Sequence, residues 1–153
     1  MIIKNMYRNI KTSGIFTLLI LLLTIMTSYA QDKDIPESKL PVEIHKYITT
    51  HFPNNKVIQV VEDNELFSKS YEVLLTDNIK LEFNGKNKIT DIDGTSKLPD
   101  SVIPKTILAH VKSTYPKSVI TDWELDNKIQ QIKLDNNLDL EFNMQGKFLR
   151  IDP

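Results

Sequence analysis

Two stretches of the sequence carry apolar residues three or four positions apart, the spacing that places side chains on one face of an α-helix. These residues are Leu40, Ile44, Tyr47, Ile48 and Phe52 in the first stretch, and Ile103, Ile107, Val111 and Tyr115 in the second. Ser38 and Ser101 precede the stretches and are N-cap candidates, because a serine side chain accepts hydrogen bonds from free N–H groups in the first turn. Pro53 and Pro116 follow the stretches, and we expect the helices to end there.

After each predicted helix, apolar and polar residues alternate, which indicates antiparallel strands with one buried face. The clearest runs cover residues 71–76, 79–83, 131–134 and 138–142, and further strands are expected at residues 56–62, 88–93, 119–125 and 147–152. Asp and Asn tolerate positive φ, so Asp77-Asn78 and Asn136-Asn137 suit the hairpin turns between runs. The alternation predicts two sets of side chains. Leu81, Phe83, Leu140 and Phe142 should lie under the helices, with Glu82 and Glu141 pointing away.

The same pattern occurs twice along the chain. Residues 35–41 (IPESKLP) return 63 positions later as residues 98–104 (LPDSVIP), and residues 81–84 (LEFN) return 59 positions later as residues 140–143. The difference falls mostly within residues 64–70, which we expect to form a longer loop in the first half. This internal duplication predicts an α+β fold of two tandem α-β-β-β-β units, residues 35–97 and 98–153, whose helices cover one face of a shared antiparallel sheet in one compact domain.

The N-terminus has the three parts of a secretory signal peptide. Lys4, Arg8 and Lys11 make its beginning cationic, an apolar run extends over residues 14–26, and small residues at positions 28 and 30 precede the expected cleavage site. The run is shorter than the roughly 17–25 residues of a spanning helix, although an uncleaved anchor is the alternative. We therefore expect cleavage after Ala30, a short mature segment at residues 31–34, a periplasmic or secreted location, and no stable membrane insertion after cleavage.

Charge and composition exclude several classes of function. Removal of residues 1–30 leaves 16 basic residues against 20 acidic ones, a net charge of about −4. Nucleic acid is a poor partner for such a chain, because affinity for it rests on Lys and Arg side chains that neutralise phosphates. The chain has no cysteine, which removes disulfides, thiol nucleophiles and thiolate metal sites together.

The sequence offers no arrangement suited to catalysis, a cofactor or a metal. His45 and His51 are six positions apart, which places them on different faces of one helix, and His110 lies in the other half. Residues 91–94 (DIDG) resemble part of a calcium loop, but the register fails: Gly94 at the sixth loop position would put Ile89 where the first carboxylate belongs. We expect neither enzymatic activity nor a cofactor nor a bound metal.

The paired motifs resemble a known family of exported proteins. They are Leu40-Pro41, Phe52-Pro53, Tyr71-Glu72-Val73, Leu81-Glu82-Phe83, Ile103-Pro104, Tyr115-Pro116 and the segment at residues 147–152 (KFLRID). Together they resemble the PepSY-like, beta-lactamase-inhibitor-like proteins over nearly all of residues 35–152. The resemblance implies a tandem α+β fold and a binding or inhibitory role, without a defined active site.

The sequence is compatible with two functions. The favoured one is an exported, non-enzymatic module that binds an envelope or exported protein, such as a peptidase or another hydrolase. The alternative is an envelope module that binds a small ligand or a peptidoglycan fragment. The candidate contact residues combine the sheet face away from the helices, the expected loop and the single tryptophan: Leu66, Phe67, Glu72, Leu74, Glu82, Trp123, Lys133 and Glu141. Core filling is the default interpretation of Trp123, and Leu66 and Phe67 either clip the loop to the core or offer a contact.

Overall fold

The computed structural model describes residues 32–65 and 68–152. The predicted signal peptide, Leu66 and Phe67 lie outside these residues. In chain order the helices and strands are β1 (Lys33–Asp34), α2 (Val42–His51), β2 (Val57–Glu65), β3 (Ser68–Leu75), β4 (Ile79–Phe83), β5 (Ile89–Asp93), α3 (Lys105–Thr114), β6 (Ile120–Asp126), β7 (Ile129–Leu134), β8 (Asp139–Asn143) and β9 (Phe148–Asp152). Three short 3₁₀ helices accompany them: η2 (Glu37–Lys39), η3 (Thr76–Asn78) and η4 (Asp100–Val102).

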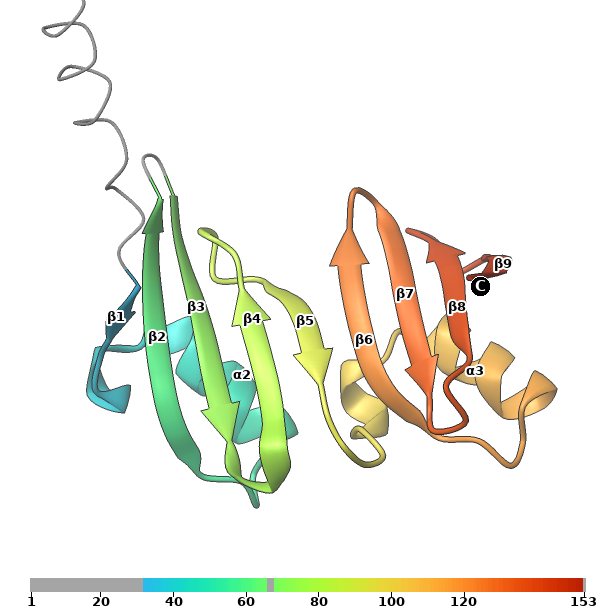
Figure 1. The fold of residues 1–153 in the computed structure, drawn as a ribbon, viewed down its shortest axis with the longest axis horizontal. Helices are drawn as coiled ribbons and strands as arrows, with labels where there is room; N and C mark the ends of the chain where they lie inside the picture. Colours follow the sequence, from blue (N-terminus) through green and yellow to red (C-terminus); the bar gives the residue numbers. More distant parts are fainter. Residues whose placement is uncertain (1–31, 66–67, 153) are drawn as a thin grey trace, which may run out of the picture.

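Within the described residues, nine strands form a single antiparallel sheet in the order of the chain, from β1 to β9. Strand β5 ends the first half and pairs with β6, which begins the second half. Figure 1 shows α2 and α3 behind the same face of this sheet, each across the strands of its own half. The predicted α+β arrangement with helices on one side of an antiparallel sheet is thus present.

The helices begin later than the serine N-caps predicted, and that prediction was wrong. Pro41 and Pro104 occupy the N-cap positions without a side-chain cap, and Ser38 and Ser101 lie in the preceding 3₁₀ helices. The reason is steric, because a residue before proline is excluded from the helical region. Leu40, for example, has ψ of 140°. The chain must therefore leave the 3₁₀ helix in an extended conformation before the α-helix can start.

The residues that lengthen the first half extend two strands rather than a loop, which corrects the loop expected at residues 64–70. Strands β2 and β3 remain paired through Asp63↔Ser70, Asn64↔Lys69 and Glu65↔Ser68. An insertion divided equally between two paired strands preserves their register, so the buried face of the hairpin does not change. The short N-terminal segment adds a further strand, since Lys33 and Asp34 in β1 pair with Glu62 and Val61.

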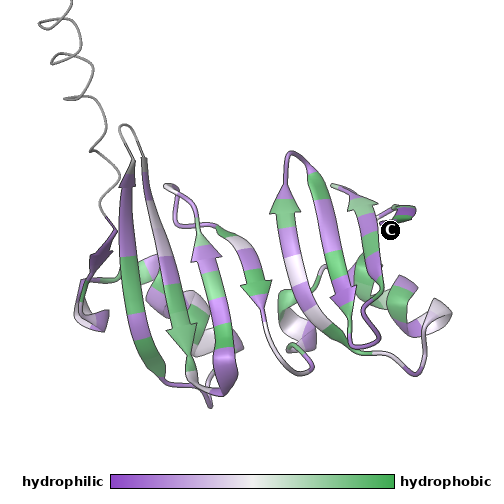
Figure 2. Cartoon of the chain, in the orientation of Figure 1, coloured by the Kyte–Doolittle hydropathy of each residue, from purple (hydrophilic) through white to green (hydrophobic). Residues whose placement is uncertain are grey.

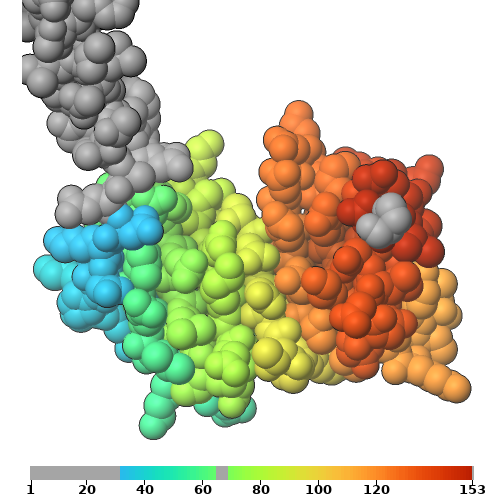
Figure 3. Space-filling model, in the orientation of Figure 1, coloured from blue at the N-terminus to red at the C-terminus, as the bar shows by residue number. Residues whose placement is uncertain are grey.

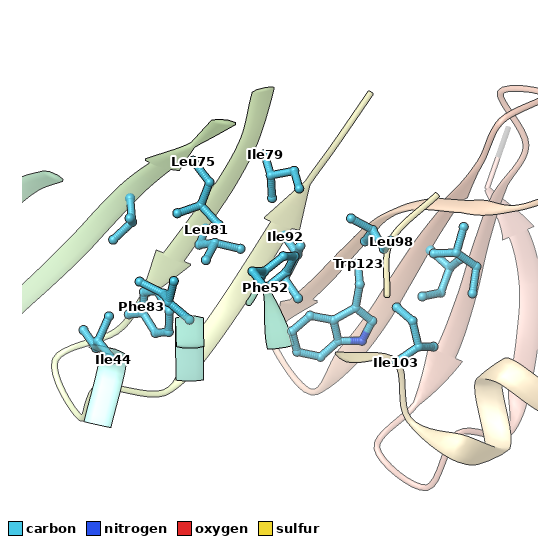
Figure 4. Close-up of a cluster of buried hydrophobic side chains, with 14 of the residues drawn as sticks. Ile44, Phe52, Leu75, Ile79, Leu81, Phe83, Ile92, Leu98, Ile103 and Trp123 are labelled. Carbon is cyan, nitrogen blue, oxygen red and sulfur yellow. The ribbon is translucent and has the colours of Figure 1, made fainter. Parts of the chain in front are cut away.

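The core lies between the helices and the sheet, and the alternation of hydropathy along each strand is visible in Figure 2. Leu81, Phe83, Leu140 and Phe142 are at most 1% exposed, as predicted. At the junction of the two halves, Ile92 of β5 pairs with Trp123 of β6. Figure 4 shows Phe52, Leu98 and Ile103 gathered around these two side chains. The apolar core is therefore continuous from one half to the other.

Candidate functional site

The sheet face that the helices leave uncovered, which we call the open face, is rich in acidic side chains and is turned toward the reader in Figure 3. Residues that alternate with the buried positions of β2–β9 lie on this face. The acidic ones include Asp63, Glu72, Glu82, Asp91, Asp93, Asp122, Glu124, Asp139, Glu141 and Asp152. The basic ones are Lys80, Lys133 and Arg150. Figure 2 shows the corresponding polar bands along the strands.

A hollow of about 350 Å³ lies on the open face of the first half. Four carboxylate residues line it: Asp32, which precedes β1, and one from each of three neighbouring strands, Asp63 of β2, Glu72 of β3 and Glu82 of β4. Val61 and Thr90 complete much of the wall. Strand pairing explains this convergence, because Val61 faces Glu72 and Glu72 faces Glu82 across adjacent ladders.

The hollow holds an acceptor that the described residues do not satisfy. The Oδ1 atom of Asp63 is buried and has no hydrogen-bond partner among them. A buried acceptor without a partner is costly, so a donor that reached this atom would gain a favourable bond. Lys80 provides the nearby positive charge, and its Nζ donates to Glu82 Oε1 at 2.8 Å and lies 3.9 Å from Asp91 Oδ2. Hydrogen bonding to Glu82 raises the pKa of Lys80, which keeps it charged.

Four carboxylates meet where the two halves join, and we call them the seam carboxylates. Asp91 faces Glu124 and Asp93 faces Asp122 across the β5–β6 ladder. Burial, together with the charges of Asp122 and Glu82, raises the pKa of Asp91 to about 7. Burial, together with the charge of Asp93, raises the pKa of Asp122 to about 6. Like charges paired directly across strands repel, so the seam favours protons or cations.

The second half neutralises the equivalent part of its open face. Arg150 of β9 forms a bidentate pair with Glu141, at 2.7 Å from Nε to Oε2 and 2.6 Å from Nη2 to Oε1. This pair lowers the pKa of Glu141 and leaves the residue 7% exposed. The duplication sets Asp91 in the first half where Arg150 lies in the second, and Glu72 where Gln131 lies. Glu82 and Glu141 are thus equivalent in position, but the side chain of Glu82 is 43% exposed and that of Glu141 only 10%.

A comparison with protein families shows to which family this chain belongs. The family described as "Putative beta-lactamase-inhibitor-like, PepSY-like" matches the chain twice, over residues 26–89 and 69–150. The chain belongs to this PepSY-like family. No curated protein matches the sequence. The boundaries of the two predicted repeats stay a prediction, since the two family matches overlap at residues 69–89.

Solved structures with this fold come from Bacteroides. One is described as a putative calcium-regulated periplasmic protein from Bacteroides thetaiotaomicron, with 30% sequence identity, a TM-score of 0.75, and coverage of 80% of this chain and 97% of that one. A putative periplasmic protein from Bacteroides vulgatus has 35% identity, a TM-score of 0.75, and coverage of 80% and 98%. A second protein from that organism, of unknown function, has 32% identity, a TM-score of 0.74, and coverage of 80% and 100%.

These periplasmic relatives agree with an exported PepSY-like protein. None of the helices in residues 32–65 and 68–152 is long and apolar enough to cross a membrane. The signal peptide and its cleavage after Ala30 stay predictions, because residues 1–30 lie outside the described part of the chain.

The predicted contact residues do not form one surface in this PepSY-like protein. Glu72, Leu74, Glu82 and Lys133 lie on the open face, whereas Trp123 points to the opposite face. Trp123 is 6% exposed, and its Nε1 donates to the buried side chain of Gln130 at 3.2 Å. Its role as an exposed contact was therefore a wrong expectation, since its strand position matches that of Ile92 and Ile132 on the covered face. Leu66 and Phe67 remain untested, because they lie outside the described residues.

Sequence reasoning missed Asp63, the seam carboxylates and Arg150. The predicted strand at residues 56–62 ends before Asp63, whereas β2 continues to Glu65, and Arg150 pairs with a residue nine positions away. A usable signal existed for the seam: Asp91 and Asp93 flank Ile92, and Asp122 and Glu124 flank Trp123, which is strand alternation. That the two runs pair with each other depends on β5 meeting β6, which no local pattern specifies.

Proposed function

We propose that this PepSY-like protein is an exported, non-enzymatic module that binds a protein partner carrying a cationic patch through its open face. A lysine or arginine of the partner enters the hollow between β2 and β4. The observation that carries the proposal is the unsatisfied Asp63 Oδ1 beside Glu72 and Glu82. A charged donor suits such a site, because hydrogen bonds between ionised groups are about twice as strong as neutral ones.

The charge of the surrounding face supports a protein partner. The hollow continues into the seam carboxylates through Glu82, which faces Asp91 across the β4–β5 ladder. A negative field spread over several strands attracts a positive surface and raises its association rate, and salt weakens this effect. The shallow shape of the site also differs from the deep, mostly apolar cavities that bind small molecules. A free cationic small ligand in the same hollow is the alternative that the experiment below distinguishes.

The test compares capture by charge variants. The exported protein, immobilised, is exposed to envelope extracts at low and at raised salt. The double variant Glu72→Gln with Glu82→Gln should capture a given partner at least tenfold more weakly, because the hollow loses two of its four carboxylates. The effect should shrink as salt rises, since exposed charges are screened. Phe67→Ala, a change outside the described residues, should weaken the same capture if Leu66 and Phe67 supply an apolar contact.

The matched control neutralises two exposed acids on the helix side of the molecule, Glu37→Gln with Glu43→Gln. It changes the net charge equally and should leave capture unchanged. Equal loss in both variants would show a response to net charge alone and would contradict the proposal. Binding of free arginine or lysine to the wild type in calorimetry, with no protein captured, would establish the small-ligand alternative. Glu141→Lys is unsuitable as a probe, because it would place the new lysine against Arg150.

A second candidate function is calcium-dependent regulation, favoured by the seam carboxylates and by the description of the neighbour from Bacteroides thetaiotaomicron. Carboxylate oxygens are the ligands that calcium prefers. As they stand, no three Asp, Glu, His or Cys side chains of the described residues are arranged to hold a metal. The ion would therefore have to draw the side chains together, and the release of their repulsion would stabilise the fold.

This candidate is tested by thermal unfolding at pH 8 with calcium or with magnesium. Calcium at millimolar concentration should raise the Tm of the wild type by several degrees and that of Asp91→Asn with Asp122→Asn by much less. Magnesium serves as the control for ionic strength. A Tm unaffected by calcium would exclude regulation at the seam and would leave the proposal for the hollow untouched.

A further inference from the structure

Among residues 32–65 and 68–152, the outer edge of β9 has no strand beside it, whereas its equivalent in the first half is paired. In the first half, β5 has two neighbours, β4 and β6. Its equivalent in the second half, β9, pairs with β8 alone among the described residues. The β4–β5 and β8–β9 ladders have the same register, including an irregularity at the same position, between Glu82 and Phe83 and between Glu141 and Phe142. The outer edge of β9 therefore has the geometry with which β5 accepts β6.

The side chains at this edge are unusually apolar for an exposed strand. The exposed large apolar residues of the described chain are Val42, Ile58, Met144, Leu149 and Ile151, and the last three belong to the β8–β9 hairpin. In the first half the equivalent positions are Gly85, Thr90 and Ile92. Ile92 is fully buried against Trp123, whereas Ile151 is 48% exposed. An exposed, apolar sheet edge is a template for pairing with another strand.

Backbone geometry gives this edge its hydrogen-bonding groups. Successive residues of a strand direct their N–H and C=O groups to alternate neighbours. In the first half, the next residue after Ile92 that directs its N–H toward the β6 side is Gly94. This N–H donates to Thr121 O at 3.0 Å. The equivalence of the two ladders places the N–H and C=O of Ile151 toward the free edge in the same way. The residue equivalent to Gly94 is Pro153, which has no N–H, so pairing at this edge must be short.

We propose that the edge of β9 is a self-association site, at which β9 of a second copy pairs antiparallel with it about a two-fold axis at Ile151. The sequence Arg150-Ile151-Asp152 is complementary to itself in this arrangement. Ile151 meets Ile151 of the second copy, and Arg150 of each copy meets Asp152 of the other. The axis stands perpendicular to the sheet, so the helices of both copies lie on one side and the two sheets join into one.

Charge distinguishes this pairing from the one inside the chain. The seam between β5 and β6 sets Asp91 against Glu124 and Asp93 against Asp122, which are like charges. The β9 pairing sets opposite charges at both equivalent positions, and opposite charges opposed across strands are stabilising. The second copy of the chain is thus a better partner for β9 than a strand with the sequence of β6. Since a few residue pairs bury less than the roughly 1,200 Å² of a standard interface, the dimer is expected to be weak.

Sedimentation velocity of the exported protein measures the association directly. The average mass should rise from monomer toward dimer between about 10 μM and 1 mM, the range of a weak interface. Asp152→Arg should lower the association constant at least tenfold, because each new arginine would face Arg150 of the other copy. Asp93→Arg makes the same change at the equivalent position inside the sheet and should leave the association constant unaltered. A monomer throughout the range, or a dimer indifferent to Asp152→Arg, would overturn the proposal.

Cross-linking locates the contact independently of the charge variants. The chain has no cysteine, so a single introduced thiol reports on one position. Ile151→Cys should give a disulfide-linked dimer under mild oxidation, since the residue lies at the two-fold axis. Ile58→Cys is the matched control: it is similarly exposed, at 59%, but lies on β2 near the opposite edge of the sheet. Linkage through position 58 in place of position 151 would assign the contact to the β1–β2 edge of the sheet and would overturn the proposal.

Discussion

At the scale of single residues, the seam between the halves is destabilised by its own charges. Asp91 and Asp122 lie on neighbouring strands, each beside further carboxylates, and partial burial reduces the water available to stabilise their charges. The pKa of Asp91 is about 7 in the folded protein, against 3.8 for an ordinary aspartate. Two lysines lie nearby: Lys80 is bonded to Glu82, and Lys133 faces Asp122 across the β6–β7 ladder.

The Asp91→Asn variant is predicted to be more stable than the wild type at pH 8. The folded state holds the Asp91 proton more tightly than the unfolded state does, so the stability that this group contributes is present below about pH 4 and is lost as the pH rises to about 7. Removing the charge should therefore raise the free energy of unfolding by about 1–3 kcal/mol at pH 8 and by much less at pH 4.5. Urea unfolding at the two pH values measures the difference.

The control for this prediction is Asp126→Asn, a change at an exposed aspartate at the end of β6. It should change stability by less than about 0.5 kcal/mol at either pH, as surface substitutions usually do. A loss of stability in Asp91→Asn at pH 8 would mean that attraction to Lys80, 3.9 Å away, outweighs burial and repulsion.

At the scale of secondary-structure elements, the two halves use equivalent turns with different residues. Between β4 and β5, Asn87 adopts φ of 58°, and between β8 and β9 the equivalent Gly146 adopts φ of 75°. Asparagine and glycine are the residues that enter this left-handed region most readily. The two positions differ in their surroundings, because Gly146 lies against the Thr106 side chain at the start of α3. Asn87 instead reaches α2 with its own side chain, whose Nδ2 donates to Glu43 at 3.4 Å.

Gly146→Ala is predicted to lower the free energy of unfolding by about 2–4 kcal/mol, from the unfavourable φ together with the overlap of the new methyl group with Thr106. Asn87→Gly, the control in the equivalent turn, needs no change of backbone and loses one exposed hydrogen bond, so its cost should stay below about 1 kcal/mol. Urea unfolding at pH 7 compares the two. Equal stability of Gly146→Ala and the wild type would show that the turn and the start of α3 move apart at little cost.

Local sequence patterns specify the helices and strands, but neighbouring residues change where these elements begin and how far they extend. The apolar spacing located both helices, and the alternation located the strands after them, because each pattern reflects burial of one face. The serines failed as N-caps since the prolines three positions later force an extended residue before each helix. The insertion in the first half failed as a loop because its residues continue the β2–β3 ladder, where pairing satisfies their backbone groups.

At the scale of the whole molecule, the two halves share one sheet, but their parts of the open face differ. The shared sheet is joined by the pairs Asp91↔Glu124, Ile92↔Trp123 and Asp93↔Asp122, and by the bond from Leu98 N–H to Ile120 O at 2.9 Å. His51 of α2 adds a contact on the helix side, with Nδ1 lying 3.0 Å from Ser101 Oγ. On the open side, Arg150 neutralises Glu141 in the second half, whereas Asp63, Glu72 and Glu82 of the first half line a hollow.

The sequence by itself determined the duplication, the two helices, the antiparallel strands and the buried positions Leu81, Phe83, Leu140 and Phe142. These features follow from the spacing of apolar and polar residues within short stretches, which the sequence shows directly. The tertiary structure alone decided that β5 meets β6, that Trp123 faces inward, and that Arg150 covers Glu141 while its equivalent, Asp91, joins a group of unneutralised carboxylates. Those outcomes depend on which strands become neighbours and on which charges then face each other, and neither is a property of any local stretch of residues.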